Sequence, residues 1–427
     1  MQNKATMPSA KSIYIWNILG SMSNALLSVL ILMIVTRTLN NLNSDIFSLA
    51  WSISQLMATV GTFQVRMYQA TDVSGKYDFR QYFLFRVFCL IIMIISSCAY
   101  VVYLKYNFYK SLIIVLICIF KAIDCFADVY EGWFQQKERL DLSGKAQTAR
   151  VIACLITMSF FAILTKDLLW ICIGIILAYL LCFYIFDIRI YKLLFSVKRN
   201  EKSVYEKKWG IHLFISTLPL FINSFLAMSI INMPKMSIDL SISKGILVQG
   251  SQSIYNIIFM PASFLTLAYI VFRPLITKMA IYWEDMQYKK FIHTLIRIFG
   301  VLFVFCIPVV FICYWIGCPI LSFLYGVNLS GNELNLIIIM IGGCLYTFSC
   351  ILDNALIVIR KQYTLIISYV ATFLVCKLLS NYLVFIRGLN GAALTYFISM
   401  SVFFGTMIII FVLGYNQQKR KKLSYVK

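Results

Sequence analysis

The chain has 427 residues, of which 61% are hydrophobic and only 13% are charged. Because soluble globular proteins carry about 25% charged residues, this composition excludes a soluble fold. The net charge of +21 does not indicate a nucleic-acid-binding protein, because the basic residues lie in short clusters between apolar runs and form no continuous basic surface.

Apolar runs that can cross a hydrocarbon core of about 30 Å as a helix recur along the whole chain. We therefore predict an all-α integral membrane protein with about twelve spanning helices. Their expected bounds are Ile13–Val35, Asp45–Val65, Tyr82–Tyr103, Ser111–Tyr130, Val151–Leu164, Leu168–Tyr191, Ile211–Ile231, Ile246–Phe272, Phe291–Ile316, Leu334–Ile357, Tyr363–Ile386 and Gly391–Leu413. The fifth span is short for a full crossing, and it follows one of the longest predicted loops, Glu131–Arg150.

The distribution of basic residues predicts the orientation of the chain. Most of the 38 Lys and Arg residues fall in the two terminal tails and in every second loop. By the positive-inside rule these segments are cytoplasmic, so both termini are expected in the cytoplasm. An even number of spans with both ends on one side permits two six-helix bundles, which we expect at residues 1–200 and 201–427, joined by the basic segment 192–208.

An ionisable side chain near the centre of a predicted span is costly unless it faces a bundle interior or an aqueous cavity. The fourth span carries Lys121, Asp124 and Asp128. Glu131 follows, and spacings of three and four residues put all four groups on one face of a helix. The eleventh span carries Lys377. The fourth-span groups indicate either a polar path across the bilayer or an ion pair of Lys121 with Asp124 that ties helices together, and both interpretations stay open.

The sequence carries none of the common catalytic or nucleotide-binding motifs. It has no Walker A sequence, no GxSxG or HExxH motif and no dinucleotide-binding fingerprint. Its thirteen cysteines include no CxxC pair and it has only two histidines, so neither a metal site nor another cofactor is expected. Transport by a protein that is not an enzyme is the function that remains.

Four short segments carry a family resemblance. They are Val35–Leu39 at the end of the first span, Glu131–Arg139 after the fourth, Asn232–Lys235 in an expected turn after the seventh, and Gly388–Ala393 before the twelfth. In these segments, and in length and span order, the chain resembles the bacterial polysaccharide flippases. They form the oligosaccharide-lipid branch of the superfamily that also contains multidrug-and-toxin exporters and the peptidoglycan-precursor flippase.

The resemblance implies two six-helix bundles around a central cavity that opens alternately to each side of the bacterial plasma (inner) membrane. The implied cargo is an oligosaccharide repeat unit linked to undecaprenyl pyrophosphate. It would move from the cytoplasmic to the outer leaflet for assembly of a surface polysaccharide such as O-antigen or capsule. Membrane lipids, a glycan polymerase and glycosyltransferases are the implied partners, and nucleic acid is not among them.

Cationic side chains are the expected contacts for the diphosphate of such a cargo, because Arg binds phosphate in a bidentate manner and Lys serves as a point charge. The candidates are Arg66 and Arg273 at the cytoplasmic entrance, Lys121 and Lys377 at mid-depth, and Arg37 and Lys235 at the exit. Topology alone would also account for the entrance and exit pairs. Asp124 and Asp128 are candidates for a coupling proton or sodium ion, or they balance the charge of Lys121.

Other functions remain open. An ion-coupled drug or metabolite exporter of the same superfamily would favour an acidic or aromatic cavity over one with buried lysines. A polytopic glycan polymerase or acyltransferase would carry a sizeable extracytoplasmic loop or an intramembrane His or Arg–Asp set. Neither feature is identified in the sequence of this chain. A facilitator-type sugar transporter would carry Asp-Arg-x-Gly-Arg-Arg between the second and third spans, and the stretch Arg66–Arg80 lacks this pattern.

Overall fold

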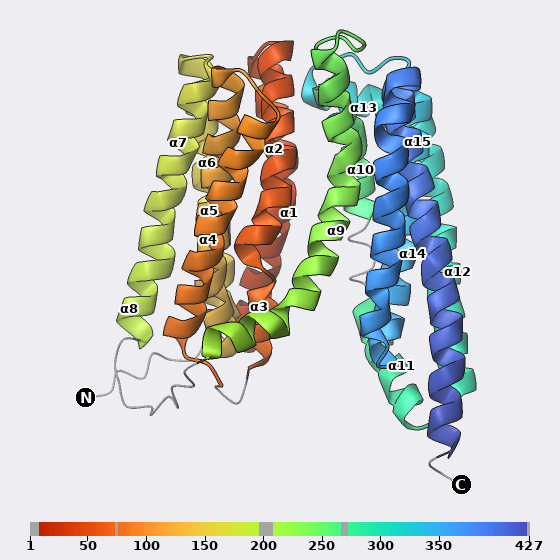
Figure 1. Ribbon diagram of the computed structural model, residues 1–427. Helices are drawn as coiled ribbons and strands as arrows, with labels where there is room; N and C mark the ends of the chain where they lie inside the picture. Colours follow the sequence, from red (N-terminus) through yellow and green to blue (C-terminus); the bar gives the residue numbers. More distant parts are fainter. Residues whose placement is uncertain (1–7, 73–75, 196–207, 266–271, 425–427) are drawn as a thin grey trace. The chain divides into compact units, whose positions relative to one another are not determined.

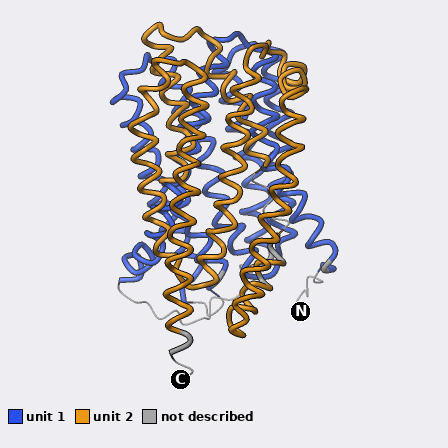
Figure 2. Tube along the Cα trace, turned by 90° about the vertical axis from the view of Figure 1, so that its right-hand side faces the viewer, with its two compact units in different colours: residues 1–225 blue, residues 226–427 orange. Residues whose placement is uncertain are grey.

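The computed structural model describes residues 8–72, 76–195, 208–265 and 272–424, and this part of the chain is helical with no β-strand (Figure 1). Contacts divide the chain into two compact units, residues 1–225 and 226–427 (Figure 2). The boundary between the units falls within the long helix α9 (Trp209–Ser243), whose first part belongs to unit 1. The predicted joint at residues 192–208 lies largely outside the described residues.

Unit 1 is a bundle built around α5. Its helices are α1 (Ala10–Thr38), α2 (Asn41–Thr62), α3 (Val65–Thr71), α4 (Phe79–Tyr103), α5 (Phe108–Gln136), α6 (Leu140–Leu164), α7 (Leu168–Cys182) and α8 (Ile190–Phe195), with a π-helical turn, η1 (Phe183–Arg189), between the last two. Helices α2, α4 and α7 pack on α5, and α1 packs on α6. A Cβ atom on Gly144 would lie 1.9 Å from the backbone oxygen of Trp16, so the close approach of α1 to α6 requires glycine at this position.

Unit 2 contains the second part of α9 and the helices that follow it. These are α10 (Ser251–Leu265), α11 (Arg273–Glu284), α12 (Tyr288–Ile312), α13 (Cys318–Tyr325), α14 (Glu333–Val358) and α15 (Leu365–Ser424), with a π-helical turn, η3 (Cys313–Gly317), and a 3₁₀ turn, η4 (Gln362–Thr364). Helices α11, α12, α14 and α15 share an apolar core that includes Trp283, Phe291 and Phe411. Burial of these aromatic side chains holds the α11–α12 hairpin against the rest of the unit.

Helix α15 is two helices joined at Gly388. This residue has φ 57° and ψ −132°, a conformation that is essentially restricted to glycine. The two alanines that follow, Ala392 and Ala393, are fully buried, and their small side chains allow the second helix to pack closely after the break. The segment Gly388–Ala393 is therefore the junction between the predicted eleventh and twelfth spans.

Every predicted span overlaps a helix of the described residues, but several bounds were wrong. The eighth span was expected to begin at Ile246, whereas α10 begins at Ser251, and residues 266–271 of this span lie outside the described residues. The second span was expected to continue through Val65, whereas α2 ends at Thr62. The segment Glu131–Arg150 was expected to be a loop, yet α5 continues to Gln136 and α6 begins at Leu140. The expected turn at Asn232–Lys235 lies inside α9, which continues to Ser243. Apolar runs do not record where a helix begins or ends, because polar residues extend α5, α6 and α9 beyond them.

Eight helical segments in the described part of the chain are long and apolar enough to cross a membrane. One of them, Gln362–Lys421, contains the break at Gly388. Helix α5 is long enough to cross a membrane, but it is not one of the eight because it carries too many charged residues. The protein is therefore an all-α, multi-pass membrane protein, while the number of twelve crossings and the cytoplasmic termini stay predictions.

Candidate functional site: a charged cavity in unit 1

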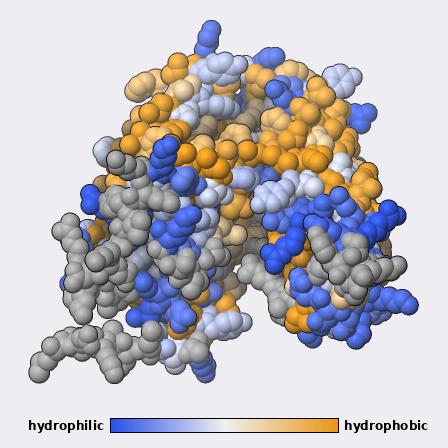
Figure 3. Space-filling model, turned by 60° about the horizontal axis from the view of Figure 1, so that its bottom comes forward, coloured by the Kyte–Doolittle hydropathy of each residue, from blue (hydrophilic) through white to orange (hydrophobic). Residues whose placement is uncertain are grey.

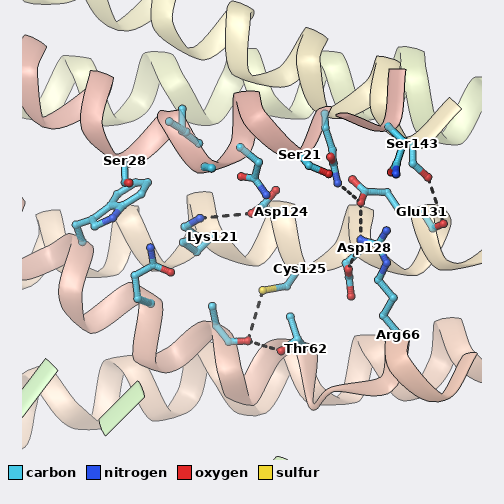
Figure 4. Close-up of a pocket in the computed structure, with 18 residues that line it drawn as sticks. Ser21, Ser28, Thr62, Arg66, Lys121, Asp124, Cys125, Asp128, Glu131 and Ser143 are labelled. Carbon is cyan, nitrogen blue, oxygen red and sulfur yellow. Dashed lines mark hydrogen bonds and ion pairs between the residues drawn. The ribbon is translucent and has the colours of Figure 1, made fainter. Parts of the chain in front are cut away.

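A polar cavity of about 590 Å³ opens among the helices of unit 1 (Figure 4). Helices α1, α2, α3, α5 and α6 supply its walls. The polar and charged lining residues are Asn17, Ser21, Asn24, Ser28, Gln55, Thr62, Arg66, Lys121, Asp124, Asp128, Glu131, Ser143 and Gln147. An aqueous cavity of this kind is the environment that ionisable groups in membrane-spanning helices require.

The predicted charged face of α5 is confirmed, because Lys121, Asp124, Asp128 and Glu131 all line this cavity. Figure 4 shows them one after another along the helix. The expected ion pair is also present, with the amine of Lys121 3.4 Å from a carboxylate oxygen of Asp124. The same amine lies 4.8 Å from the centre of the Trp51 ring, which adds a cation–π contact from α2.

Asp128 is held by two arginines from different helices. One of its oxygens lies 3.0 Å from Arg66 of α3, and the other lies 2.7 Å from Arg86 of α4. The Arg86 side chain is fully buried and also donates a hydrogen bond of 2.9 Å to the backbone oxygen of Gly61.

Glu131 connects the cavity to a second buried ion pair. It accepts hydrogen bonds from Arg66 at 2.7 Å and from Gln147 at 2.5 Å, and it pairs with Arg150 of α6. Arg150 in turn lies 2.5 Å from Asp187 in η1, and both side chains are almost completely buried. One continuous network thus ties α3, α4, α5, α6 and η1 together.

This network is balanced in charge. Its cations are Arg66, Arg86 and Arg150, and its carboxylates are Asp128, Glu131 and Asp187. The separate pair of Lys121 and Asp124 adds one charge of each sign to the cavity. Burial of unbalanced charge is strongly unfavourable, so the matched numbers explain how this many ionised groups are tolerated inside one helical bundle.

Arg66 reaches the cavity because the chain breaks between α2 and α3. Phe63 and Gln64 both adopt the left-handed conformation, with φ of 44° and 53°. Non-glycine residues rarely adopt it, and here two contacts stabilise the break. The Phe63 ring stacks on Phe221 with centroids 4.3 Å apart, and the Gln64 amide donates a hydrogen bond of 2.8 Å to Ser224. The short helix α3 that follows points Arg66 towards α5.

The other predicted contact residues lie elsewhere. Arg37 is exposed in the last turn of α1 and does not line the cavity. Lys235 and Lys377 belong to unit 2, where Lys235 lies over the Phe259 ring at 4.6 Å and Lys377 is exposed on α15. Arg273 is the first residue of α11, and its side chain lies outside the described residues. The cavity therefore brings together Arg66, Lys121, Asp124 and Asp128.

Sequence analysis missed three members of the network, Arg86, Arg150 and Asp187. Arg86 and Arg150 had been counted with the basic residues that set topology. Asp187 is the only carboxylate in the predicted sixth span, and a carboxylate at such a position signals that a buried cation lies nearby.

No protein-family model matches the chain, and no curated protein matches it in sequence. Solved structures match it over almost its whole length. An inward-facing multidrug resistance MATE transporter of the MOP superfamily has a TM-score of 0.67 at 12% identity, covering 95% of this chain and 99% of the other. The lipid II flippase MurJ in an inward closed conformation has a TM-score of 0.66 at 15% identity, covering 96% and 90%.

A third structure is a MOP superfamily transporter from Pyrococcus furiosus, described as having a binding pocket of reverse polarity. It has a TM-score of 0.62 at 12% identity and covers 96% of each chain. At identities this low, the similarity concerns the fold. The protein is therefore a multi-pass membrane protein with the all-α fold that the MATE transporters and MurJ share.

Proposed function

We propose that the protein is a flippase. Its cargo would be oligosaccharide repeat units linked to undecaprenyl pyrophosphate, moved by alternating access from the cytoplasmic to the outer leaflet of a bacterial inner membrane for the assembly of surface polysaccharide. The observation that carries this proposal is the charged cavity among the helices of unit 1, in a membrane-protein fold shared with a lipid II flippase.

The cavity lining suits a sugar-bearing diphosphate. Sugars and a diphosphate cannot cross a hydrocarbon core unaided, because their polar groups would lose their hydrogen bonds to water. Amide and hydroxyl side chains on α1, α2 and α6, such as Asn24, Gln55 and Ser143, supply donors and acceptors for sugar hydroxyl groups. Lys121 and Arg66 supply positive charge for the diphosphate.

Arg66 is the cation that can change partners at the lowest cost. Asp128 and Glu131 each have a second arginine partner, Arg86 and Arg150, and both of those side chains are almost completely buried. The Arg66 side chain is 29% exposed. If Arg66 turned towards a diphosphate, both carboxylates would keep a buried counter-ion.

The other four candidate contact residues keep the roles that their predicted positions in the membrane suggest. Arg273 contributes to the cytoplasmic entrance, Lys377 acts at mid-depth in unit 2, and Arg37 and Lys235 lie on the exit path. Asp124 is the more suitable of the two ion-coupling candidates, because its one ion pair, with Lys121 at 3.4 Å, is longer than both of the pairs that hold Asp128.

Reconstitution tests the proposal directly. The purified protein in liposomes is expected to move fluorescently labelled undecaprenyl-pyrophosphate-linked oligosaccharide from one leaflet to the other, and liposomes without protein serve as the control. In a glycan-producing bacterium that has no second flippase, deletion of the gene should leave lipid-linked repeat units in the inner leaflet. Normal surface glycan in that strain, together with no transfer in liposomes, would refute the proposal.

One observation favours a second candidate, an ion-coupled exporter of a cationic drug or metabolite. Three carboxylates line the cavity against two cations, which gives the lining itself a net negative charge. An exporter of this kind should lower the accumulation of a cationic dye in cells and should leave lipid-linked oligosaccharide where it is. The two assays therefore separate the two functions.

A further inference from the structure

A second polar pocket, of about 570 Å³, lies between α11 and α12 in unit 2. Its lining residues are Leu275, Lys278, Tyr282, Lys289, Lys290, His293, Thr294 and Arg297. The end of unit 2 that comes forward in Figure 3 is largely hydrophilic, and apolar residues lie behind it. No residue of this pocket belongs to the network in unit 1.

The pocket is lined by four Lys or Arg side chains and by no carboxylate. Within the described residues, no ion pair neutralises Lys278, Lys289, Lys290 or Arg297. The contrast with unit 1 is clear, because every cation of the network there has a carboxylate partner. Like charges held together without counter-ions repel one another, so an anionic ligand would relieve the repulsion.

The hairpin of α11 and α12 fixes the pocket. Trp283 on α11 and Phe291 on α12 point into the apolar core of the unit, with ring centroids 5.3 Å apart. The spacing of Lys290 and Arg297, seven residues, keeps both on one face of α12. Lys290 also lies 5.9 Å from the ring of Tyr282, which joins the two walls of the pocket.

The same face of α12 continues as an exposed apolar stripe. Val301, Val304 and Pro308 are all exposed, and they follow Arg297 at spacings of four, seven and eleven residues, which keeps them in line with it. The first residues of α12 are also the start of a segment long and apolar enough to span the membrane, Tyr288–Tyr325. The basic pocket therefore lies where a membrane–water interface is expected, and the stripe leads from it into the hydrocarbon region.

We propose that this pocket binds the phosphate headgroup of an anionic lipid, whose chain lies along the Val301–Pro308 stripe. Arg297 is suited to a bidentate contact with phosphate oxygens, and the lysines act as point charges. The hydroxyl groups of Tyr282 and Thr294 are available as further donors. Basic pockets on the cytoplasmic side of membrane proteins commonly bind anionic headgroups. The inference stands apart from the proposed flippase function.

Two lipids could supply this chemistry, an anionic phospholipid and a polyprenyl diphosphate, and the test separates them. The full-length protein in mild detergent is titrated with phosphatidylglycerol, undecaprenyl pyrophosphate, inorganic pyrophosphate or zwitterionic phosphatidylcholine. Bound lipid is counted by native mass spectrometry. The pocket variant is Lys289→Gln/Lys290→Gln/Arg297→Gln. The matched control, Arg360→Gln/Lys361→Gln/Arg420→Gln, removes the same charge outside the pocket.

One or both anionic lipids should bind more tightly than phosphatidylcholine. The pocket variant should lose about a hundredfold of that affinity, because each of its three lost cations contributes about fivefold to the binding of an anionic headgroup. The control variant should bind as the unchanged protein does. Equal losses in the two variants, or no preference for anionic lipid, would overturn the site. Equally tight binding of inorganic pyrophosphate would overturn the role of the apolar stripe. None of these outcomes depends on flippase activity.

Discussion

Replacement of Arg150 by Met tests whether charge balance holds unit 1 together. Among the described residues Asp187 has Arg150 as its ion-pair partner, at 2.5 Å, and its side chain is completely buried. Loss of one member of a buried ion pair costs about 3–5 kcal/mol, because the other charge stays buried without compensation. We therefore expect Arg150→Met to lower the free energy of unfolding by about this amount.

The double variant Arg150→Met/Asp187→Leu separates charge balance from packing. It removes one charge of each sign, and Glu131 keeps its contacts with Arg66 and Gln147. Replacement of a whole buried ion pair by apolar residues is often close to neutral, whereas loss of one partner is costly, so we expect the double variant to be more stable than Arg150→Met by about 2 kcal/mol or more.

Denaturant unfolding of the purified protein in mixed micelles measures these differences. Lys145→Met on the same helix is the control, because its side chain is 41% exposed and lies 4.0 Å from Asp141. Exposed pairs contribute about 1 kcal/mol or less. The reasoning fails if Arg150→Met/Asp187→Leu is no more stable than Arg150→Met, or if Arg150→Met costs no more than Lys145→Met.

Three further predictions concern transport and folding. Lys121→Ala and Lys377→Ala should each slow transfer of labelled lipid-linked oligosaccharide in liposomes by about tenfold, the value of one charge-assisted contact, and full transfer by the double variant would remove both from the site. Asp128→Asn should lower the free energy of unfolding by about 3 kcal/mol, because the buried Arg86 loses its carboxylate partner. Asp124→Asn should fold normally and alter only transport. Identical denaturant unfolding curves for the two variants would contradict this prediction. Gly388→Ala should destabilise the protein by about 1–3 kcal/mol through its strained backbone, and an unchanged unfolding midpoint would argue against that strain.

Local periodicity explains which features could be predicted from the sequence. The apolar runs identified the helices, because the length of a run and the thickness of a bilayer are directly comparable. The charged face of α5 was also predictable, since Lys121, Asp124, Asp128 and Glu131 lie within three helical turns of one another. A cavity beside these residues could also be expected, because an ionisable side chain in a spanning helix is costly unless it faces such a space.

Contacts between distant segments explain what could not be predicted. Arg86 meets a partner 42 residues away and Arg150 meets one 37 residues away, and no local pattern records either pairing. Arg150 also precedes the apolar run that begins at Val151, so it was assigned to a loop although α6 begins at Leu140. Basic residues near span ends are ambiguous for this reason, because the positive-inside rule accounts for them whether or not they are buried.

The position of Arg66 shows how the rigid and the adaptable parts of the network differ. Arg86 and Arg150 project from the long helices α4 and α6 and are almost completely buried, so moving either one would expose a carboxylate to an apolar bundle. Arg66 projects from the short helix α3, follows two left-handed residues and is partly exposed in the cavity. Under the proposed function, a diphosphate would compete for Arg66 without unbalancing the buried core, because the two inner arginines continue to neutralise Asp128 and Glu131. The same arrangement thus provides a stable bundle and one exchangeable positive charge at the surface of the cavity.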